Sequence, residues 1–248
     1  MLSTQSPHLL IGLDVETSDW DDQITFAKQE YHFRSGFPCH VDHMVSKGYV
    51  CGLGYCVFSR DSQGSNTYLV EEPVSIPIKL PNGESIAAKA FAYHGLSDAV
   101  CSNGQDFSSA LKPIIALLRQ GAQICCHNLA HATLVFCREV QKRTLMGPPT
   151  LSEDDAQLLL HCLYLGHCTS ILASETNGHY CRLIDEYQRC FGELIAADVA
   201  HVPGLDAYKC GRLFLLYNKA SLVPISDAQT ATRHTKKAKV AVSPEVDP

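Results

Sequence analysis

The sequence predicts a single α/β domain in which a mixed β-sheet is flanked by helices. Three observations predict it. An apolar run at residues 8–14 is typical of a strand buried on both faces. Strand-like runs then follow as a meander, and the second half of the chain changes to a helix–strand–helix order. No linker divides residues 8–218, and a chain of 248 residues, 46% of them hydrophobic, suffices for one large core.

Strands are expected through the first half of the chain. The run at residues 8–14, HLLIGLD, ends in a carboxylate, as a buried strand leading into a polar edge would. Residues 18–48 are polar and aromatic with scattered Gly and Pro, so we interpret them as a long loop or insertion. Runs at 49–59 and 67–75 flank a turn-forming segment and predict a hairpin. A third short strand is expected at 85–91.

Helices are expected through the second half. Within residues 107–119, apolar side chains recur at helical spacing, namely Leu111, Ile114, Ile115 and Leu118. The same reasoning gives a short strand at 123–126 and further helices at 129–143, 152–163, 181–191 and 204–218.

The two ends of the chain lack this periodicity. We expect a flexible N-terminus over residues 1–7 and a folded domain over 8–220. From residue 221 the composition turns to Pro, Ser, Thr, Lys and Asp without a period, which predicts a disordered tail over 221–248.

Charge and composition restrict the function classes. A net charge of −6 argues against broad electrostatic coating of nucleic acid, although metal ions can supply positive charge at a local site. No apolar run is long enough for a transmembrane helix, and residues 1–8 do not predict a secretory signal. We therefore expect an intracellular protein, cytoplasmic or nuclear and not secreted or membrane-bound.

The 12 cysteines then predict free thiols rather than a disulfide framework. Closely spaced Cys and His occur at Cys39, His40 and His43, and again at 161–162 and 167–168. Zinc sites usually contain Cys-x2–4-Cys pairs, and no Cys-x-x-Cys occurs in this chain. We interpret these residues as thiols and histidines without zinc.

The sharpest chemical signal is Asp14-Val15-Glu16-Thr17 at the end of the first predicted strand. Residues i and i+2 of a strand point to the same face, so Asp14 and Glu16 can reach one point together. Two converging carboxylates suit a hard divalent cation. Paired acids are also common on solvated edges, so this motif alone is a weak indication.

Further motifs follow in a characteristic order. Cys126-His127-Asn128 comes after a short strand and opens a helix, and later His201 and Asp206 are separated by four residues. This set resembles the DEDDh 3′–5′ exonucleases, also called the DnaQ-like or RNase T-like family. Asp14 and Glu16 match the family's D-x-E motif, and His201 and Asp206 match its H-x4-D motif. The segment 93–97 also resembles a family segment that precedes the first long helix.

The resemblance covers roughly residues 8–218 and implies an RNase H-like fold with a five-stranded mixed sheet. It implies a metal-dependent 3′–5′ exonuclease that releases nucleoside monophosphates from DNA or RNA ends. The family uses two Mg²⁺ or Mn²⁺ ions about 4 Å apart. By resemblance, Asp14, Glu16 and Asp206 ligate metal and His201 is the general base.

The resemblance also assigns substrate contacts. Thr17 follows the D-x-E motif, where the family contacts the 3′-terminal nucleotide. Asn128 is expected either to contact substrate or to cap the helix that it opens. His127 is expected to hold this motif in place. Within the expected insertion at 18–48, four aromatic residues are expected either to stack on bases or to pack the insertion onto the core: Trp20, Tyr31, Phe33 and Phe37.

One departure from the family pattern bears on activity. The second motif normally reads H-N-x-x-x-D, whereas this chain has Ala132 at the position of the acid. The loss weakens the environment of the second ion, so we expect impaired turnover with nucleic-acid binding retained. Ala132 is either an introduced, silencing change in an active lineage or a natural change in a catalytically inactive nucleic-acid-binding module. The sequence leaves open DNA or RNA, single or double strand, and the oligomeric state.

Overall fold

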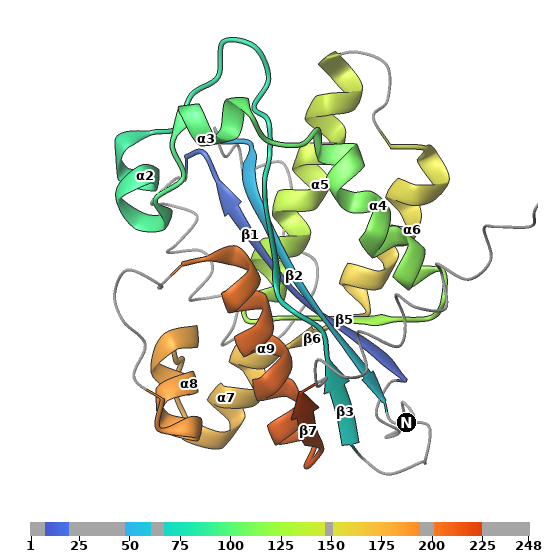
Figure 1. Ribbon diagram of the computed structural model, residues 1–248, viewed down its shortest axis with the longest axis vertical. Coiled ribbons are helices and arrows are strands. Elements are labelled where there is room, and N and C mark those ends of the chain that lie inside the picture. The colour runs from blue at the N-terminus through green and yellow to red at the C-terminus, as the bar shows by residue number, and fades with distance from the viewer. Residues whose placement is uncertain (1–7, 20–47, 61–66, 147–150, 194–200, 225–248) are drawn as a thin grey trace, which may run out of the picture.

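The computed structural model describes residues 8–19, 48–60, 67–146, 151–193 and 201–224. These residues form one seven-stranded mixed sheet with helices on both faces (Figure 1). The strands are β1 (Leu9–Thr17), β2 (Val50–Arg60), β3 (Thr67–Val70), β4 (Val74–Pro77), β5 (Gln123–Cys126), β6 (His167–Cys168) and β7 (Ser221–Pro224). Their order is β6-β5-β1-β2-β3-β7, and β4 also pairs with β2. The predicted fold class is confirmed.

Strand β1 lies at the centre of this sheet. It pairs antiparallel with β2 from Leu9 opposite Ser59 to Thr17 opposite Val50, and parallel with β5 on its other edge. The register between β1 and β2 shifts at Glu16 and Thr17. Such irregularities re-aim side chains where pairing ends. This one lies in the D-x-E motif.

Helices cover the two faces of the sheet in two groups. They are α2 (Ala88–His94), α3 (Asp98–Ser102), α4 (Phe107–Leu118), α5 (Leu129–Met146), α6 (Glu153–Tyr164), α7 (Thr169–Asn177), α8 (Leu183–Phe191) and α9 (Pro203–Tyr217). Figure 1 shows α4, α5 and α6 on one side of the sheet and α7, α8 and α9 on the other. Helices α2 and α3 lie beside the end of β1. None of the described helices is both long and apolar enough to cross a bilayer.

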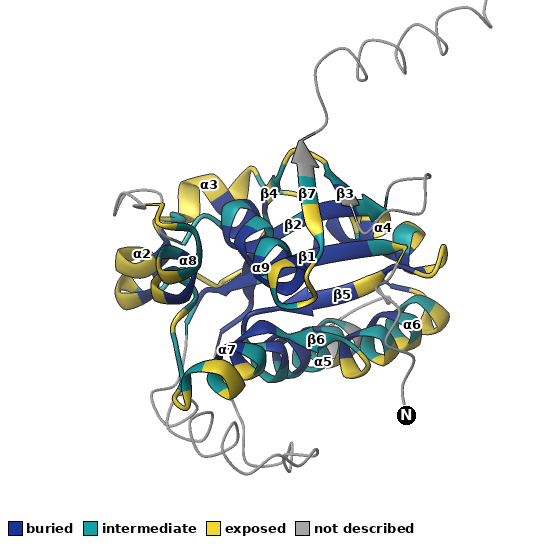
Figure 2. Ribbon diagram, turned by 90° about the horizontal axis from the view of Figure 1, so that it is seen from below, coloured by how far each residue is buried: buried dark blue, intermediate teal, exposed yellow. Residues whose placement is uncertain are grey.

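Each face of the sheet has its own hydrophobic cluster. Ile11, Leu13 and Val15 of β1 pack with α4, α5 and α6, whereas Leu10 packs with Ala207 and Phe214 of α9. This division follows from the two-residue period of a strand. Figure 2 shows buried residues running along β1, β2 and β5. Asp14 and Glu16 have the parity of Leu10, and therefore face α9.

Two glycines let α9 lie unusually close to the sheet. A Cβ atom at Gly12 would come within 2.0 Å of the backbone oxygen of Ala207, and one at Gly54 within 1.9 Å of the backbone of Pro203. Any larger residue at either position would push the first turns of α9 away from β1 and β2. This close approach brings Asp206 to the carboxylates of β1.

Several predictions of local structure are wrong. Residues 88–94 form helix α2, not the strand expected at 85–91, because the alanines there favour a helix, which Gly95 terminates with a φ of 72°. The strand expected at 67–75 is two strands, β3 and β4, which pair with different parts of β2. Glu71 still donates its backbone N–H to Val57 O of β2 at 2.9 Å, and the pairing is interrupted after it, where Pro73 has no backbone N–H to donate.

The sheet is also larger than expected. It has seven strands rather than five, because β6 is only two residues long and β7 lies beyond the predicted domain. Strand β7 falls at the start of the segment expected to be disordered, and pairs parallel with β3. Helices α3 and α7 were not predicted either. Residues 20–47, with the aromatic candidates of the expected insertion, and residues 225–248 of the expected tail lie outside the described residues.

Candidate active site

The two carboxylates of the D-x-E motif sit at the carboxyl end of β1. Glu16 is buried and Asp14 is partly buried. Burial is the largest cause that raises the pKa of each carboxyl group well above its usual range, followed by the charge of Asp206 for Asp14 and that of Asp14 for Glu16. Asp14 Oδ2 is buried and has no hydrogen-bond partner. Buried, mutually repelling carboxylates with an unsatisfied oxygen atom are suited to binding a cation.

The H-x4-D motif approaches these carboxylates from α9. Pro203 occupies the first turn of this helix, and the backbone N–H of Asp206 donates to Val202 O at 2.9 Å. The turn buries the Asp206 side chain against the sheet. His201 lies just before the helix in a left-handed conformation with φ of 64°, which is uncommon for a residue other than glycine.

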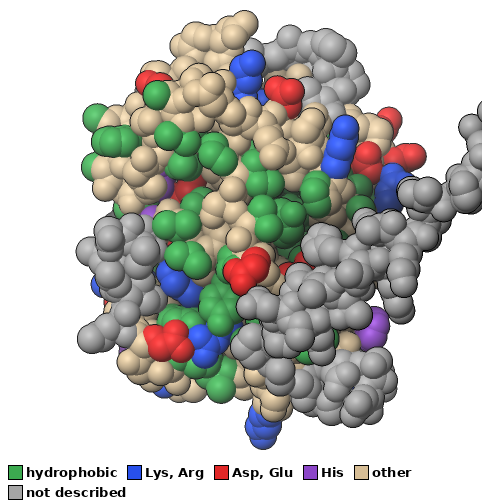
Figure 3. Space-filling model, in the orientation of Figure 1, with side chains coloured by type: hydrophobic (Ala, Val, Ile, Leu, Met, Phe, Trp, Pro, Cys, Tyr) green, Lys and Arg blue, Asp and Glu red, His purple; other side chains and the backbone are tan. Residues whose placement is uncertain are grey.

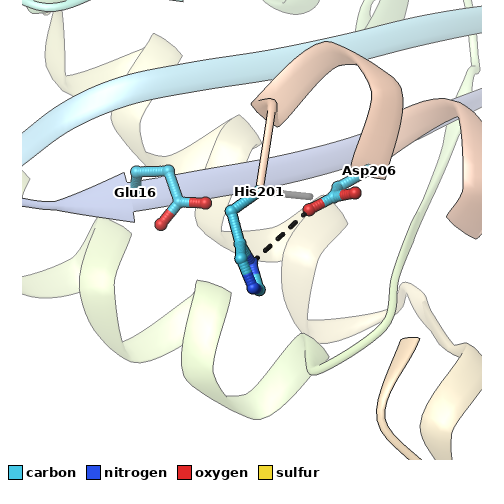
Figure 4. A group of neighbouring side chains, drawn as sticks. All are labelled: Glu16, His201 and Asp206. Carbon is cyan, nitrogen blue, oxygen red and sulfur yellow. Dashed lines mark ion pairs between the residues drawn. The ribbon is translucent and has the colours of Figure 1, made fainter. Parts of the chain in front are cut away.

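The two motifs converge on one point. Ligand atoms of Glu16, His201 and Asp206 all lie within 4.8 Å of one another, and this is the single such group found among the described residues. Figure 4 shows the His201 ring reaching down between the two carboxylates, with His201 Nδ1 3.9 Å from Asp206 Oδ2. The carboxylate oxygens of this group suit Mg²⁺ or Mn²⁺, and the imidazole nitrogen is a ligand typical of transition metals.

His201 is held in place by an aromatic neighbour. The ring of Tyr93, near the end of α2, lies 3.7 Å from the His201 ring, centroid to centroid. Desolvation is the largest influence on His201 and lowers its pKa, with Asp206 opposing the shift. The imidazole is therefore neutral at pH 7, the form that accepts a proton.

A lysine lies inside the same cluster. Lys209 follows Asp206 by one helical turn, and its Nζ atom is 2.6 Å from Asp206 Oδ1. Both side chains are buried. Sequence reasoning missed Lys209, although its position three residues after Asp206 on a predicted helix was a usable signal. It also missed the contact between Tyr93 and His201, which depends on how α2 folds.

The segment 93–97 anchors the end of β1. His94 Nε2 donates to the backbone oxygen of Thr17 at 3.2 Å, and the backbone N–H of Leu96 donates to His94 Nδ1 at 3.1 Å. Desolvation is the largest cause of the lowered pKa of His94, consistent with this neutral arrangement. The Thr17 backbone oxygen is thus bound within the protein, and Thr17 itself is buried.

The second motif sits at the neighbouring strand end and has different surroundings. His127 is buried, with Nε2 donating to Cys181 O at 2.8 Å and Nδ1 3.1 Å from Thr169 Oγ1. Asn128 Oδ1 accepts the backbone N–H of His131 at 3.3 Å, which caps α5. Ala132 is 4% exposed and belongs to the hydrophobic cluster under α5. In this structure these side chains serve the framework, and none is in the cluster formed by Glu16, His201 and Asp206.

The thiols play no visible part in this site. Every cysteine in the described residues is free, as expected, and the Cys-His pairs at 161–162 and 167–168 form no metal-binding group. Cys39, His40 and His43 lie outside the described residues.

No model of a known protein family matches the chain, and no curated protein does. Solved structures do share its fold. The nuclease domain of 3′hExo, a DEDDh family member bound to rAMP, matches with a TM-score of 0.52 and 9% identity, over 88% of this chain and 94% of that one. E. coli Exonuclease I in complex with a dT13 oligonucleotide matches with a TM-score of 0.52 and 13% identity, over 87% of this chain and 42% of that one. The chain therefore has the fold of these exonuclease domains.

Proposed function

We propose that this protein acts at nucleic-acid 3′ ends as a metal-dependent 3′–5′ exonuclease that releases nucleoside monophosphates. The convergence of Glu16, His201 and Asp206, with the Asp14 carboxylate close enough to interact with both acids through its charge, carries this proposal. Two carboxylates from a strand end, a third from a helix and a neutral imidazole are what hydrolysis of a phosphodiester requires. The likeness in fold to exonuclease domains supports the same reading.

In this function Asp14, Glu16 and Asp206 would hold Mg²⁺ or Mn²⁺. A bound divalent ion makes water more acidic and stabilises negative charge on a phosphate. Two such ions are the expectation from the family resemblance. The protein's own contribution is to keep three carboxylates close together and partly desolvated, so that a divalent cation placed among them would relieve their mutual repulsion.

His201 would accept the proton of the attacking water. Its lowered pKa keeps the imidazole neutral at pH 7, so a nitrogen lone pair is available. The Tyr93 ring, tilted by 33° against the His201 ring, and the left-handed backbone conformation of His201 would restrict the imidazole to one orientation. His201 also belongs to the group that could ligate a metal, and the effect of His201→Ala on metal affinity distinguishes the role of a base from that of a ligand.

Substrate contacts are assigned to the rims of the two strand ends. Thr17 ends β1 next to the carboxylates, and we propose that its hydroxyl contacts the terminal nucleotide. Asn128 would contact the substrate in addition to capping α5, and His127 would hold Asn128 in position through Thr169 and Cys181.

A second candidate is a nucleic-acid-binding module of the same fold without turnover. Ala132 favours it, because a buried methyl group stands at the position where the family has an acid. The proposed carboxylates would then bind a metal ion and a terminal phosphate without hydrolysing the phosphodiester.

One experiment separates the two candidates. End-labelled RNA and DNA oligonucleotides are incubated with Mg²⁺ or Mn²⁺ and either the unsubstituted chain or its Ala132→Asp variant. Laddering from the 3′ end in the variant, with weak or no laddering in the unsubstituted chain, supports an exonuclease whose activity position 132 limits. The matched control is Ala130→Asp, which adds the same charge to the same helix at a partly exposed position.

Retained binding without laddering in either protein would favour the binding module. Neither binding nor cleavage of any 3′ end would rule out both candidates. Comparing the four substrates, single- and double-stranded RNA and DNA, then identifies the substrate class.

A further inference from the structure

The lysine in the site is the feature that the proposed function does not explain. The Lys209 side chain is 7% exposed and that of Asp206 is 8% exposed, with 2.6 Å between Nζ and Oδ1. Lysine is almost never buried to this degree unless it is paired with a carboxylate. This pair is formed by a proposed metal ligand, so the ammonium group occupies a position where it competes with a cation or substitutes for one.

The charges in the cluster can be counted. When ionised, Asp14, Glu16 and Asp206 carry three negative charges, and Lys209 returns one positive charge. The influence of Lys209 extends beyond its partner, because its charge also acts on the Asp14 carboxyl group. Position 132 contributes no charge. The buried site therefore has two net negative charges, which a single divalent cation neutralises, whereas a second ion would leave excess positive charge in a desolvated site.

The arrangement of ligand atoms agrees with this count. Lys209 binds Asp206 Oδ1, and Oδ2 of the same carboxylate is on the side of His201. Glu16, His201 and Asp206 form one group of ion-binding size, and no second group exists among the residues that the structure describes. Two-metal sites place their ions about 3.5–4 Å apart and need bridging and flanking carboxylates for both.

We propose that Lys209 supplies the second positive charge of this site, so that the protein binds one divalent cation where a two-metal nuclease binds two. The inference rests on the proposed function, because it takes Asp14, Glu16 and Asp206 as the metal ligands. Lys209 is a positioning residue, since it acts through the carboxylates of Asp206 and Asp14. One bound ion and one fixed ammonium group make the site neutral, which lets a phosphodiester approach without a second metal ion.

Counting bound Mn²⁺ tests this directly. Free Mn²⁺ is measured by electron paramagnetic resonance during titration of the full chain, its Lys209→Met variant and the control Lys89→Met. Lys89 pairs with Asp19 at 3.1 Å near the same strand end, but its side chain is 45% exposed. We expect one Mn²⁺ per unsubstituted chain, and the same affinity in the control.

Loss of the buried ammonium should strengthen Mn²⁺ binding by about tenfold or more in Lys209→Met, because one repelling charge is removed at short range. A second, weaker Mn²⁺ should then bind to the variant. Mn²⁺ should also raise the melting temperature of this variant more than that of the unsubstituted chain, since the ion replaces the missing partner of Asp206. A purely structural lysine would change stability without increasing the affinity or the number of ions.

Three results overturn the proposal: two ions bound by the unsubstituted chain, no ion bound by it, or an unchanged or weaker affinity of Lys209→Met for Mn²⁺. If Lys209→Met does not fold, Lys209→Gln replaces it, and the number of Mn²⁺ ions bound by the unsubstituted chain remains decisive. The titration contains no nucleic acid. A chain that binds one Mn²⁺ but no 3′ end would thus refute the proposed function and leave this inference standing.

Discussion

The carboxyl ends of β1 and β5 are neighbours in the same sheet, yet they have different contents. The end of β1 carries Asp14 and Glu16, which repel each other and have raised pKa values. The end of β5 leads into His127 and Asn128, whose side chains are bonded within the protein, and then into Ala132 in the hydrophobic cluster. The end of β1 has a buried carboxylate oxygen without a hydrogen-bond partner, Asp14 Oδ2, whereas the polar side chains at the end of β5 are hydrogen-bonded. Unsatisfied buried groups reduce stability and so point to a ligand.

The face around these strand ends adds to the contrast. Phe91, Tyr93 and Val100 of α2 and α3 are exposed apolar side chains, and hydrophobic atoms gather over these helices in Figure 3. Tyr93 connects this surface to His201. The β1 side therefore has both the reactive groups and an exposed aromatic surface beside them.

The largest effect is expected from Asp14→Asn. It removes a carboxylate that faces both other acids, so Mn²⁺ affinity should fall by about 100-fold or more, as expected for loss of one charged ligand in a low-dielectric site. Cleavage in the Ala132→Asp background should be abolished. Isothermal titration with Mn²⁺ and the laddering assay measure the two losses.

The same variant should not destabilise the metal-free protein. The native pKa values of Asp14 and Glu16 are raised, so the native state binds more protons than the unfolded state above the usual carboxyl pKa. Metal-free stability therefore falls as pH rises through the native pKa values. Asn at position 14 reduces this slope, and melting temperatures across pH measure it. A metal-free Asp14→Asn variant that is less stable than the unsubstituted chain at high pH would contradict this account.

His201→Ala in the Ala132→Asp background should follow in size. Removal of a general base typically lowers turnover by about 10²–10⁴-fold. Metal affinity should change little if His201 acts as the base, and should fall together with turnover if it ligates the ion. Because burial lowers the His201 pKa, activity should persist at pH values below the usual histidine pKa and be lost when the ring becomes protonated. If His201→Ala has the same pH–rate profile as its parent protein, His201 is not the general base.

On the β5 side the expected effects are on stability. His127→Ala removes the hydrogen bond to the Cys181 carbonyl and one of the two hydrogen bonds of the Thr169 hydroxyl, which still contacts Cys126 O, so the free energy of unfolding should fall by about 1–3 kcal/mol. The affinity for Mn²⁺ should be unchanged. Urea denaturation and Mn²⁺ titration are compared on the same sample. A selective loss of Mn²⁺ affinity would show that the two strand ends are not separate in function.

The smallest effect is expected from Asn128→Ala. Loss of the capping contact to His131 should lower the free energy of unfolding by about 1 kcal/mol. If Asn128 also contacts the substrate, binding of a 3′ end weakens further in this variant. Asn128→Asp serves as the control, because it keeps the cap. Equal binding by all three proteins would leave Asn128 with the capping role alone.

Local patterns in the sequence predicted much of this protein. The strands β1 and β5 and the helices α4, α5, α6, α8 and α9 were predicted close to their observed bounds, because strand and helix periods are properties of neighbouring residues. The errors fall where pairing between distant segments decides. Residues 67–75 form two strands because β2 offers two separate pairing sites, and β7 is ordered because β3 pairs with it.

The candidate site divides in the same way. By itself the sequence determined that Asp14 and Glu16 share one face of a strand, and that Asp206 and Lys209 lie one turn apart on a helix, because both spacings follow from backbone geometry. The tertiary structure decided that these two elements meet, since Gly12 and Gly54 allow α9 to approach the sheet. It also decided that Lys209 is buried and that the Tyr93 ring lies against the His201 ring, because such contacts depend on how distant elements pack and leave no periodic trace in the chain.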